Sequence, residues 1–562
     1  MAGALREVGL ETEAGRYAVG FVAYGAAPAF DHAFTASHME GLPYVWFAVF
    51  DGQPTTVDTA GWTGDGGDEI MWQPEISEAE YRTGFDRIRI ALADGETYQV
   101  NYTQRLRASF RSDPEGLFRR LYHAQPGEYS AFLDTGRFAI LCTSPELFFE
   151  ADGRSITSKP MKGTAPRGRW AEEDVERRDG LRGSPKERAE NVMIVDLMRS
   201  DLGRIARTGT VRVPALFETV RLPTVWQMTS TVTAELREDI RLEDIFGAAF
   251  PPGSVTGAPK TRTMALIDQL EVSPRGVYCG AIGVAGPGRQ AAFNVAIRTV
   301  VVDRETGEAE CGVGGGVTWD STAGGEYAEL QTKSRFLIRQ PADFDLLETM
   351  RLENGRYYLL DRHLARLLQS ADYFGFRLDD SEVAQRLDAL AGSLQDGRFR
   401  VRLAVSRTGK VCVDSSAVGL VTEWHARLAD GPVDELDPFL FHKTTHRAVY
   451  DRHRAGFGPT DDALLWNQRG EVTEFTLGNL MYELDGQLYT PTRECGLLNG
   501  TLRAEMLEQS SITERRLPVG ELASCAALWH LNSVRLVTPV LLEGYANLTA
   551  QPTPAAIARL LL

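Results

Sequence analysis

The chain changes character near residue 340, and this change constrains its fold more than any other feature of the sequence. Short β-rich segments alternate with helical stretches up to about Arg339, whereas strands and glycine-containing turns dominate after Leu346. A chain of 562 residues is also too long to form one hydrophobic core. We therefore expect two domains, residues 1–340 and 345–562, with a short linker at Pro341-Ala342-Asp343.

Hydrophobic spacing predicts several elements of the first half. Phe138–Cys142 and Ala291–Ile297 are apolar enough for strands, and the apolar run Tyr44–Phe50 has the length of a buried strand. Apolar residues recur at three- and four-residue spacing in Lys186–Ile205, which predicts a helix, and Glu326–Ile338 predicts another. The first half therefore mixes strands with helices.

The second half opens with a strand, a tight turn and a helix. Leu346–Leu352 predicts the strand, and Glu353-Asn354-Gly355 predicts the turn of a hairpin. One face of the helix that follows carries His363, Leu364, Leu367, Leu368 and Ala371.

Charge and cysteine usage exclude some partners. The net charge of −17 argues against nucleic acid and against an anionic membrane. The first residues lack the apolar segment of a signal peptide, and no apolar run is long enough to span a membrane. The six cysteines form no C-x-x-C pair, which is typical of reduced thiols. We therefore expect a soluble, cytoplasmic protein that binds any anionic substrate through a local basic cluster.

Lys162 is the candidate nucleophile of the first half. It lies in the run SKPMKGTAPRG (residues 158–168), where proline, glycine and threonine restrict the backbone. A lysine becomes nucleophilic when burial or neighbouring cations favour its uncharged amine. Taken alone, a lysine in such a run is better explained as a solvated loop residue.

Two pairs of glutamates are candidate metal ligands. Glu187 and Glu190 are three residues apart on one predicted helix, and Glu326 and Glu329 are three apart on the other, with Lys333 one turn further. Mg²⁺ prefers a few carboxylates together with water and a substrate oxygen. Taken alone, each pair is better explained as a solvated helix face.

Four runs in order carry a family resemblance. The run around Lys162 is followed by ERAENVMIVDL (187–197), GSVTGAPK (253–260) and GGG (314–316). In this order they resemble the chorismate-utilising enzymes: anthranilate synthase, aminodeoxychorismate synthase component I and salicylate synthase. Lysine in Pro-x-Lys-Gly-Thr is similar to the aminodeoxychorismate branch, whereas anthranilate synthases usually carry alanine there. The resemblance implies an α+β fold with an anthranilate-synthase-type β-sandwich surrounded by helices.

This resemblance also implies roles for single residues. Lys162 would be the covalent nucleophile, and Glu146 of Ser144-Pro145-Glu146 would be the general acid/base, with a pKa raised by burial. The residues that would bind the substrate are Arg298, Tyr278, Lys333, Thr256, Lys260, Gln99 and the backbone of Gly314, Gly315 and Gly316.

The same resemblance implies which residues bind the metal and indicates what the incoming nucleophile is not. Glu190 and Glu329 would bind Mg²⁺ directly, with Glu187 and Glu326 beside them. Gln99 stands where salicylate and isochorismate synthases carry a water-activating lysine. This difference argues against water as the nucleophile.

The second half resembles another family. Its runs are HLARL (363–367), KTTHR (443–447), EFTLGNL (474–480) and GLLNGTLR (496–503). In this order they resemble fold-type IV pyridoxal-phosphate enzymes, which include the branched-chain and D-amino-acid aminotransferases and aminodeoxychorismate lyase. The resemblance covers about residues 346–555 and implies an α/β domain of two subdomains.

Cofactor-binding residues follow from the second resemblance. Lys443 would hold pyridoxal 5′-phosphate as a Schiff base and transfer protons, and Glu474 would keep the pyridine nitrogen protonated. The residues that would bind the phosphate are Arg366 and the backbone near Thr501, Leu502, Ser533 and Val534.

Together the two resemblances imply one pathway. The first half would convert chorismate and ammonia to 4-amino-4-deoxychorismate, and the second would release pyruvate to give 4-aminobenzoate for folate synthesis. The sequence has no Gly-x-Cys-x-Gly run, so the ammonia would come from a separate glutamine amidotransferase subunit or from solution. The resemblance also allows a homodimer formed through the second domain.

Two alternatives remain open. One is an anthranilate-type synthase fused to a branched-chain or D-amino-acid transaminase. The other is a non-catalytic chorismate-binding scaffold attached to an active lyase.

Overall fold

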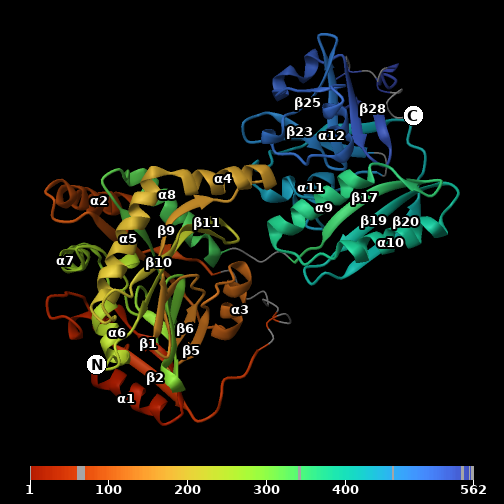
Figure 1. Ribbon diagram of the computed structural model, residues 1–562. Helices are drawn as coiled ribbons and strands as arrows, with labels where there is room; N and C mark the ends of the chain where they lie inside the picture. Colours follow the sequence, from red (N-terminus) through yellow and green to blue (C-terminus); the bar gives the residue numbers. More distant parts are fainter. Residues whose placement is uncertain are drawn as a thin grey trace. The chain divides into compact units, whose positions relative to one another are not determined.

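The computed structural model (Figure 1) describes residues 2–57, 59, 62, 70–338, 343–458, 461–545, 548, 550–555 and 557. The chain divides into two compact units, Met1–Arg167 with Arg177–Pro341, and Gly168–Glu176 with Ala342–Leu562. Helices and strands are abundant in both units, which confirms the predicted α+β class. The predicted linker residues Pro341 and Ala342 lie outside the described residues.

Two antiparallel sheets form the first unit. The order of the first sheet is β10 (Arg212–Arg221), β11 (Val225–Glu235), β8 (Ser155–Lys159), β7 (Leu147–Asp152), β14 (Gln290–Val295), β13 (Ala281–Gly286), β1 (Tyr17–Val22) and β2 (Val45–Phe50), and β9 (Met161–Pro166) pairs with β11. The order of the second is β12 (Gly257–Ala258), β4 (Gln99–Ser109), β16 (Glu308–Val317), β15 (Thr299–Asp303), β6 (Phe138–Cys142) and β5 (Ala131–Asp134), and β3 (Gln73–Pro74) pairs with β4.

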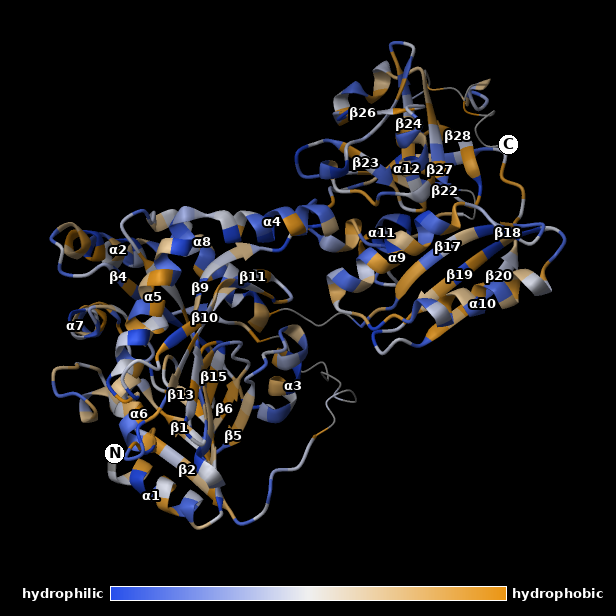
Figure 2. Cartoon of the chain, viewed as in Figure 1, coloured by the Kyte–Doolittle hydropathy of each residue, from blue (hydrophilic) through white to orange (hydrophobic). Residues whose placement is uncertain are grey.

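The two sheets pack face to face, with helices on their outer faces. Apolar residues from both sheets, among them Phe21, Ile282, Ile140 and Val301, form the core between them. Figure 2 shows this hydrophobic character along β6 and β15. The first sheet is covered by α1 (Ala2–Glu13), α5 (Pro185–Gly203) and α6 (Leu242–Ala249), and the second by α2 (Glu78–Ala93), α3 (Pro114–Ala124), α7 (Lys260–Leu270) and α8 (Ala323–Ser334). The unit is a β-sandwich surrounded by helices.

The predicted elements of this unit occur, with one correction. The strand Phe138–Cys142 is β6, and the helices expected over Lys186–Ile205 and Glu326–Ile338 are α5 and α8. The run Tyr44–Phe50 forms β2, but the expectation of a buried strand is wrong, because Phe50 is 52% exposed. Among the described strands, β2 pairs only with β1 and lies at the sheet edge, where a strand has a neighbour on one side only.

The second unit contains two subdomains. The first is a sheet in the order β18 (Arg356–Tyr357), β17 (Leu346–Glu353), β19 (Arg398–Val405) and β20 (Val411–Ala417), and it packs against α9 (Leu360–Phe374) and α10 (Asp380–Ser393). The predicted strand, hairpin and helix at the start of this half are therefore confirmed by β17, β18 and α9.

The second subdomain is built on an eight-stranded sheet. Its order is β23 (Val472–Phe475), β22 (Asp461–Trp466), β21 (Trp424–Leu428), β28 (Leu536–Leu542), β27 (Ala527–Asn532), β24 (Gly478–Leu484), β25 (Gln487–Thr490) and β26 (Thr513–Glu514). β23 also pairs with β24, which closes six of these strands into a ring. The helices of this subdomain are α11 (Ala448–Arg454) and α12 (Thr501–Glu508). The remaining described α-helix, α4 (Ala171–Gly183), lies between β9 and α5 in the chain.

Among the described residues, no helix combines the length and the apolar character that crossing a membrane requires.

Two candidate active sites

The first candidate site is a cavity of the first unit with Lys162 in its wall. Lys162 lies on β9, and its Nζ is 3.2 Å from Glu190 Oε2. A β-carbon added at Gly316 would lie 2.2 Å from this Nζ, so only glycine leaves room for the lysine there. Asn191 Nδ2 donates to the Lys162 carbonyl at 3.1 Å, which fixes the backbone of the strand.

Glu146 is a buried acid in the wall of the same cavity. It lies between β6 and β7, is 3% exposed, and its Oε1 accepts a hydrogen bond from the Met161 N–H at 3.2 Å. Burial raises the pKa of Glu146 from 4.5 to about 7, against the opposing effects of hydrogen bonds from Ser254 and Met161 and of the Lys162 charge. A carboxyl that titrates near neutral pH can both donate and accept a proton.

The raised pKa of Glu146 predicts a pH-dependent stability. Because the folded state keeps the proton that the unfolded state releases above pH 4.5, stability falls as the pH rises from 4.5 and the loss is complete above about 7. Glu146→Gln keeps the acceptor oxygen and removes this loss, so the variant should be more stable than wild type by about 3 kcal/mol at pH 8, with no gain below pH 4.5. Denaturant unfolding of the first unit at several pH values measures this gain.

The exposed Glu150 on β7 provides the matched control. Glu150→Gln should change the unfolding free energy by less than about 0.5 kcal/mol at either pH. Equal stability of Glu146→Gln and wild type at pH 8 would contradict a raised pKa in the folded state.

Four predicted metal ligands line this cavity and repel one another. They are Glu187 and Glu190 of α5 and Glu326 and Glu329 of α8. Burial and the neighbouring Glu190 raise the pKa of Glu187, and burial and Glu329 raise that of Glu326. Lysines neutralise the other two, since Lys333 Nζ is 2.8 Å from Glu329 Oε1 and Lys162 contacts Glu190. In the described part of the chain, no three His, Cys, Asp or Glu side chains form a preformed metal cluster.

Arg298 is the strongest candidate anion anchor of this cavity. Within the described residues its buried Nη1 has no hydrogen-bond partner, and burial lowers its pKa to about 10. A buried guanidinium without a partner is costly unless a ligand carboxylate completes it. Tyr278 and Lys333 also line the cavity, and Lys333 donates to the Gly314 carbonyl at 3.1 Å.

Several predicted substrate residues lie outside the cavity lining. The Thr256 hydroxyl is buried and donates to the carbonyls of Pro252 and Gly253. Lys260 is buried and paired with Asp201 at 2.7 Å. Gln99 is fully buried beside Gly316, on the side where a β-carbon would point, and neither of its amide atoms has a partner in the described part of the chain. Gly314 and Gly316 line the cavity, whereas Gly315 faces Glu326.

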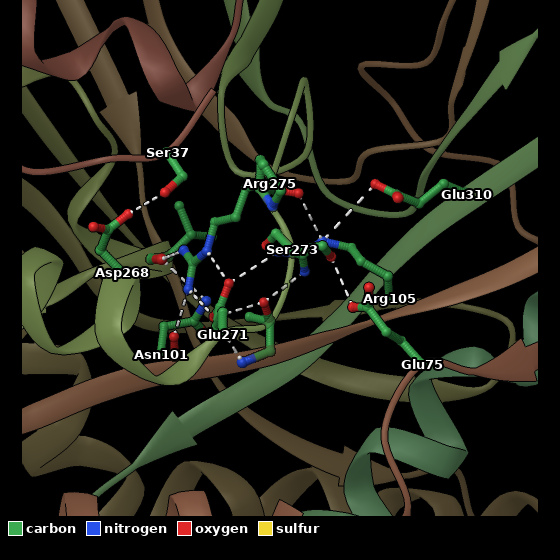
Figure 3. A network of polar contacts seen from close by, with 12 residues as sticks. Ser37, Glu75, Asn101, Arg105, Asp268, Glu271, Ser273, Arg275 and Glu310 are labelled. Atoms are coloured by element: carbon green, nitrogen blue, oxygen red, sulfur yellow. Dashed lines mark hydrogen bonds and ion pairs between the residues drawn. The ribbon is translucent and has the colours of Figure 1, made fainter. Parts of the chain in front are cut away.

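A buried ion network supports the cavity wall from behind (Figure 3). Glu271 binds Arg105 Nη2 at 2.9 Å and Arg275 Nη2 at 2.6 Å, with each of these side chains at most 4% exposed. Arg275 also donates to the carbonyls of Asn101 and Val255 at 2.7 Å, and both residues line the cavity. The network therefore fixes the backbone of Asn101 on β4 and of Val255, the residue after Ser254, and Ser254 in turn contacts Glu146.

The second candidate site is a cavity of about 340 Å³ in the second unit, with Lys443 in its wall. Lys443 follows the 3-10 turn Pro438–Leu440, and its carbonyl accepts a hydrogen bond from Leu347 N–H at 3.0 Å. Burial, Arg366 and Arg447 lower its pKa to about 8. A larger share of the amine is therefore uncharged at neutral pH, as attack on a carbonyl group requires.

Glu474 faces this cavity as a buried carboxyl with fixed orientation. Its Oε1 accepts from the Tyr450 hydroxyl at 2.8 Å and from Leu498 N–H at 3.2 Å, and its Oε2 accepts from Asn479 Nδ2 at 2.9 Å. Burial raises its pKa to about 8. A carboxyl held in this way is suited to a protonated ring nitrogen.

Anion-binding groups gather at another part of the same cavity. Arg366 of α9 is fixed by Glu348 through contacts of 2.8 and 2.6 Å. Burial opposes ionisation of Glu348, but Arg366 and His363 outweigh it and hold the pKa of this carboxyl at about 2. Thr501 and Leu502 begin α12, whose first N–H groups have no partner within the helix. Ser533 and Val534 line the cavity too, although Val534 N–H already donates to Asn532.

Several lining residues were not predicted from the sequence. In the first cavity these are Asn101, Ser254, Gln227 and Lys186, of which only Ser254 lay in a recognised run. In the second they are Arg400, Arg402, Arg535, Arg447, Tyr450 and Asn479, of which Arg447 and Asn479 lay in recognised runs.

Comparisons with known proteins match the two halves of the chain to two families. The model of the chorismate binding enzyme family matches residues 63–339, and the model of amino-transferase class IV matches residues 345–542. A crystal structure of anthranilate synthase component I from Streptococcus pneumoniae is 26% identical with a TM-score of 0.53, covering 60% of this chain and 85% of that chain.

Two curated relatives match the first half. Aminodeoxychorismate synthase component 1 of Klebsiella aerogenes is 41% identical over 48% of this chain, and anthranilate synthase component 1 of Streptomyces coelicolor is 37% identical over 52%. The match spans 59% of the length of the first relative and 56% of the second. Residues 63–339 of this chain therefore form a chorismate binding enzyme domain, and residues 345–542 form an amino-transferase class IV domain.

Proposed function

We propose that the first unit converts chorismate and ammonia to 4-amino-4-deoxychorismate and water, and that the second converts this product to 4-aminobenzoate and pyruvate. The observation that carries the proposal is Lys162, a lysine amine in the first cavity beside Glu190, Glu146 and the unpartnered Arg298. The second domain supports it, because an amine product of the first reaction is a substrate for amine chemistry at Lys443.

In the first cavity, Lys162 would attack the ring and Glu146 would deliver a proton. The amine adds at C2 while the C4 hydroxyl leaves, protonated by Glu146 to water. Ammonia then adds at C4, and the bond to Lys162 breaks, which restores the free lysine. Arg298 and Lys333 would neutralise the two carboxylates of chorismate.

We also propose that Mg²⁺ binds in this cavity. Burial raises the pKa values of Glu187 and Glu326, and repulsion from Glu190 and Glu329 raises them further; a divalent cation would relieve this repulsion. The ion would exchange for the lysine contacts of Glu190 and Glu329 and hold a substrate carboxylate. The four residues present therefore suit the ion.

The metal assignment predicts a loss of Mg²⁺ dependence. Glu190→Gln and Glu329→Gln each remove one negative ligand, so each should lower the first activity by on the order of 100-fold or more and weaken Mg²⁺ binding. Asp196→Asn is the control, because Asp196 is an exposed residue of α5 paired with Arg199. Titration of activity and of binding with Mg²⁺ measures both effects, and full activity of wild type in a chelator would contradict the assignment.

We propose pyridoxal 5′-phosphate as the cofactor of the second cavity. The donor set fits: Lys443 for the aldehyde, Glu474 for the ring nitrogen, and Arg366 with the N-terminus of α12 for the phosphate. When bound, the cofactor supplies an electron sink for the carbon that carries the amine.

The residues of this cavity would then move protons and exclude water. Lys443 would take the proton from C4 of the substrate, which forms the aromatic ring as the C3–O bond breaks. The enol that leaves takes up a proton and becomes pyruvate. Glu474 would keep the ring nitrogen protonated, and Tyr450 and Asn479 would hold Glu474 in place.

The source of ammonia belongs to the proposal as well. The name of the Klebsiella relative, aminodeoxychorismate synthase component 1, supports a separate amidotransferase subunit. We propose such a subunit as the ammonia donor, and ammonium in solution as its substitute. A homodimer formed through the second domain, and a cytoplasmic location, are parts of the same proposal.

Product identification tests the proposed function. Chorismate, ammonium and Mg²⁺ without pyridoxal phosphate should give 4-amino-4-deoxychorismate, identified by mass and chromatography. Anthranilate as the product would favour the second candidate, an anthranilate-type synthase, which the Streptomyces coelicolor relative supports. Absence of any chorismate conversion would favour a scaffold.

A further inference from the structure

The second cavity carries more positive charge than its cofactor requires. Besides Lys443 and Arg366, four arginines line it: Arg400, Arg402, Arg447 and Arg535. Among the described lining residues the only carboxyl is Glu474, which the ring nitrogen would use. The lining of this cavity is therefore positively charged, although the net charge of the whole chain is −17.

Strand geometry brings two of these arginines to the cavity. Arg400 and Arg402 alternate on β19, so both side chains project from the same face of the sheet. Arg402 lies opposite Thr349 of β17, which also lines the cavity. Arg400 lies opposite Arg351, and like charges directly across a strand pair are unfavourable. Arg535 comes from the turn between β27 and β28.

Four of the arginines in and around this cavity already have partners. Arg351 and Arg398 share Glu353, with Arg398 Nη2 2.8 Å from its Oε1. Arg402 Nη1 is 3.4 Å from Asp414 Oδ2. Arg447, which also lines the cavity, donates to the Thr476 carbonyl at 2.6 Å.

Arg400 and Arg535 differ from these residues. In the part of the chain that the structure describes, neither has a carboxylate partner within 4.0 Å, and the buried Nε of Arg535 has no hydrogen-bond partner. Burial and repulsion from Arg400 lower the pKa of Arg535. Two guanidinium groups that repel each other beside a cavity are stabilised by an anion between them.

We propose that Arg400 and Arg535 form a carboxylate subsite of the second cavity and select amine substrates that carry two carboxylates. The inference rests on the proposed function and deepens it. A guanidinium binds a carboxylate through two parallel N–H···O bonds, so the pair can hold a carboxylate remote from the reacting amine. An aliphatic amino acid carries only one carboxylate and would leave this subsite empty.

Binding of dicarboxylates to the protein with its cofactor tests the subsite. The probes are isophthalate, with two carboxylates, and benzoate, with one, and the change in the cofactor's absorption spectrum reports binding in this cavity. Wild type should bind isophthalate at least about tenfold more tightly than benzoate, and Arg400→Gln and Arg535→Gln should each remove most of this preference. Arg400→Lys should restore part of it.

Arg398→Gln is the matched control. Arg398 lies two residues from Arg400 on the same strand, is paired with Glu353 and does not line the cavity, so its loss should leave the preference unchanged. Arg400 is exposed, so Arg400→Gln should retain the fold and the cofactor spectrum even if Arg535→Gln disturbs its turn. Wild-type preference for isophthalate in Arg400→Gln would overturn the proposal.

Kinetics with 4-amino-4-deoxychorismate separates this inference from the proposed function. If wild type forms 4-aminobenzoate and Arg400→Gln keeps the same KM, the proposed subsite is contradicted and the proposed function is supported. If wild type forms no 4-aminobenzoate but the arginine-dependent preference for isophthalate persists, the proposed function is wrong and the subsite stands. Product formation with a KM raised about tenfold or more in Arg400→Gln supports both.

Discussion

Lys162→Ala should abolish formation of 4-amino-4-deoxychorismate and leave the second activity intact. The amine that would attack C2 is removed, so the first rate should fall by on the order of 10³ or more. The cavity and its glutamates remain, because the alanine side chain fits within the space of the lysine. The two rates are measured separately, with chorismate plus ammonium for the first and supplied 4-amino-4-deoxychorismate for the second.

Lys159→Ala is the matched control for this variant. Lys159 lies on the adjacent strand β8 and does not line the cavity, so both rates should stay near wild type. Gain of anthranilate formation by Lys162→Ala would agree with a covalent role. Undiminished synthesis of 4-amino-4-deoxychorismate would show that Lys162 does not form a bond to the ring.

Lys443→Ala should have the opposite effect to Lys162→Ala: the second reaction should be lost and the first retained. Without this amine the second cavity would lose the proposed attachment point for the cofactor and the proposed proton carrier, so pyruvate release should fall by on the order of 10³ or more. The first reaction needs neither, and 4-amino-4-deoxychorismate should accumulate from chorismate. Accumulation and pyruvate are followed in the same reaction mixture.

A covalent label complements the rate measurement. Borohydride treatment of the wild-type protein with its cofactor should fix pyridoxyl phosphate to Lys443, located by peptide mass mapping. Lys410→Ala, at an exposed lysine of the same unit, should label and react like wild type. Pyruvate release by Lys443→Ala at the wild-type rate would exclude the proposed role.

Several of the residues that the sequence predicts for each site line the same cavity in the structure. One cavity of the second unit is lined by four predicted residues that are far apart in the chain: Lys443, Glu474, Arg366 and Thr501. They could be predicted because each lies in a run with a recognisable spacing. The same holds for Lys162 and Glu146 in the first cavity. A recognisable run therefore made it possible to predict a residue whose role depends on the residues next to it in the sequence.

Residues outside such runs could not be predicted. Arg400 is one residue of an alternating strand and Arg535 is part of a turn, and neither reveals its cavity until the sheet is folded. Thr256 lay in a recognised run, but the sequence does not show that its hydroxyl is used by the local backbone. Whether β2 is buried depends on its position in the sheet. An apolar run in the sequence does not specify that position.

We propose that one chain carries out both reactions in sequence, and the ratio of the final products tests this proposal. Purified protein with chorismate, ammonium, Mg²⁺ and pyridoxal phosphate should release 4-aminobenzoate and pyruvate in equal amounts, with no anthranilate. Release of anthranilate and pyruvate, or of no aromatic amine, would contradict it.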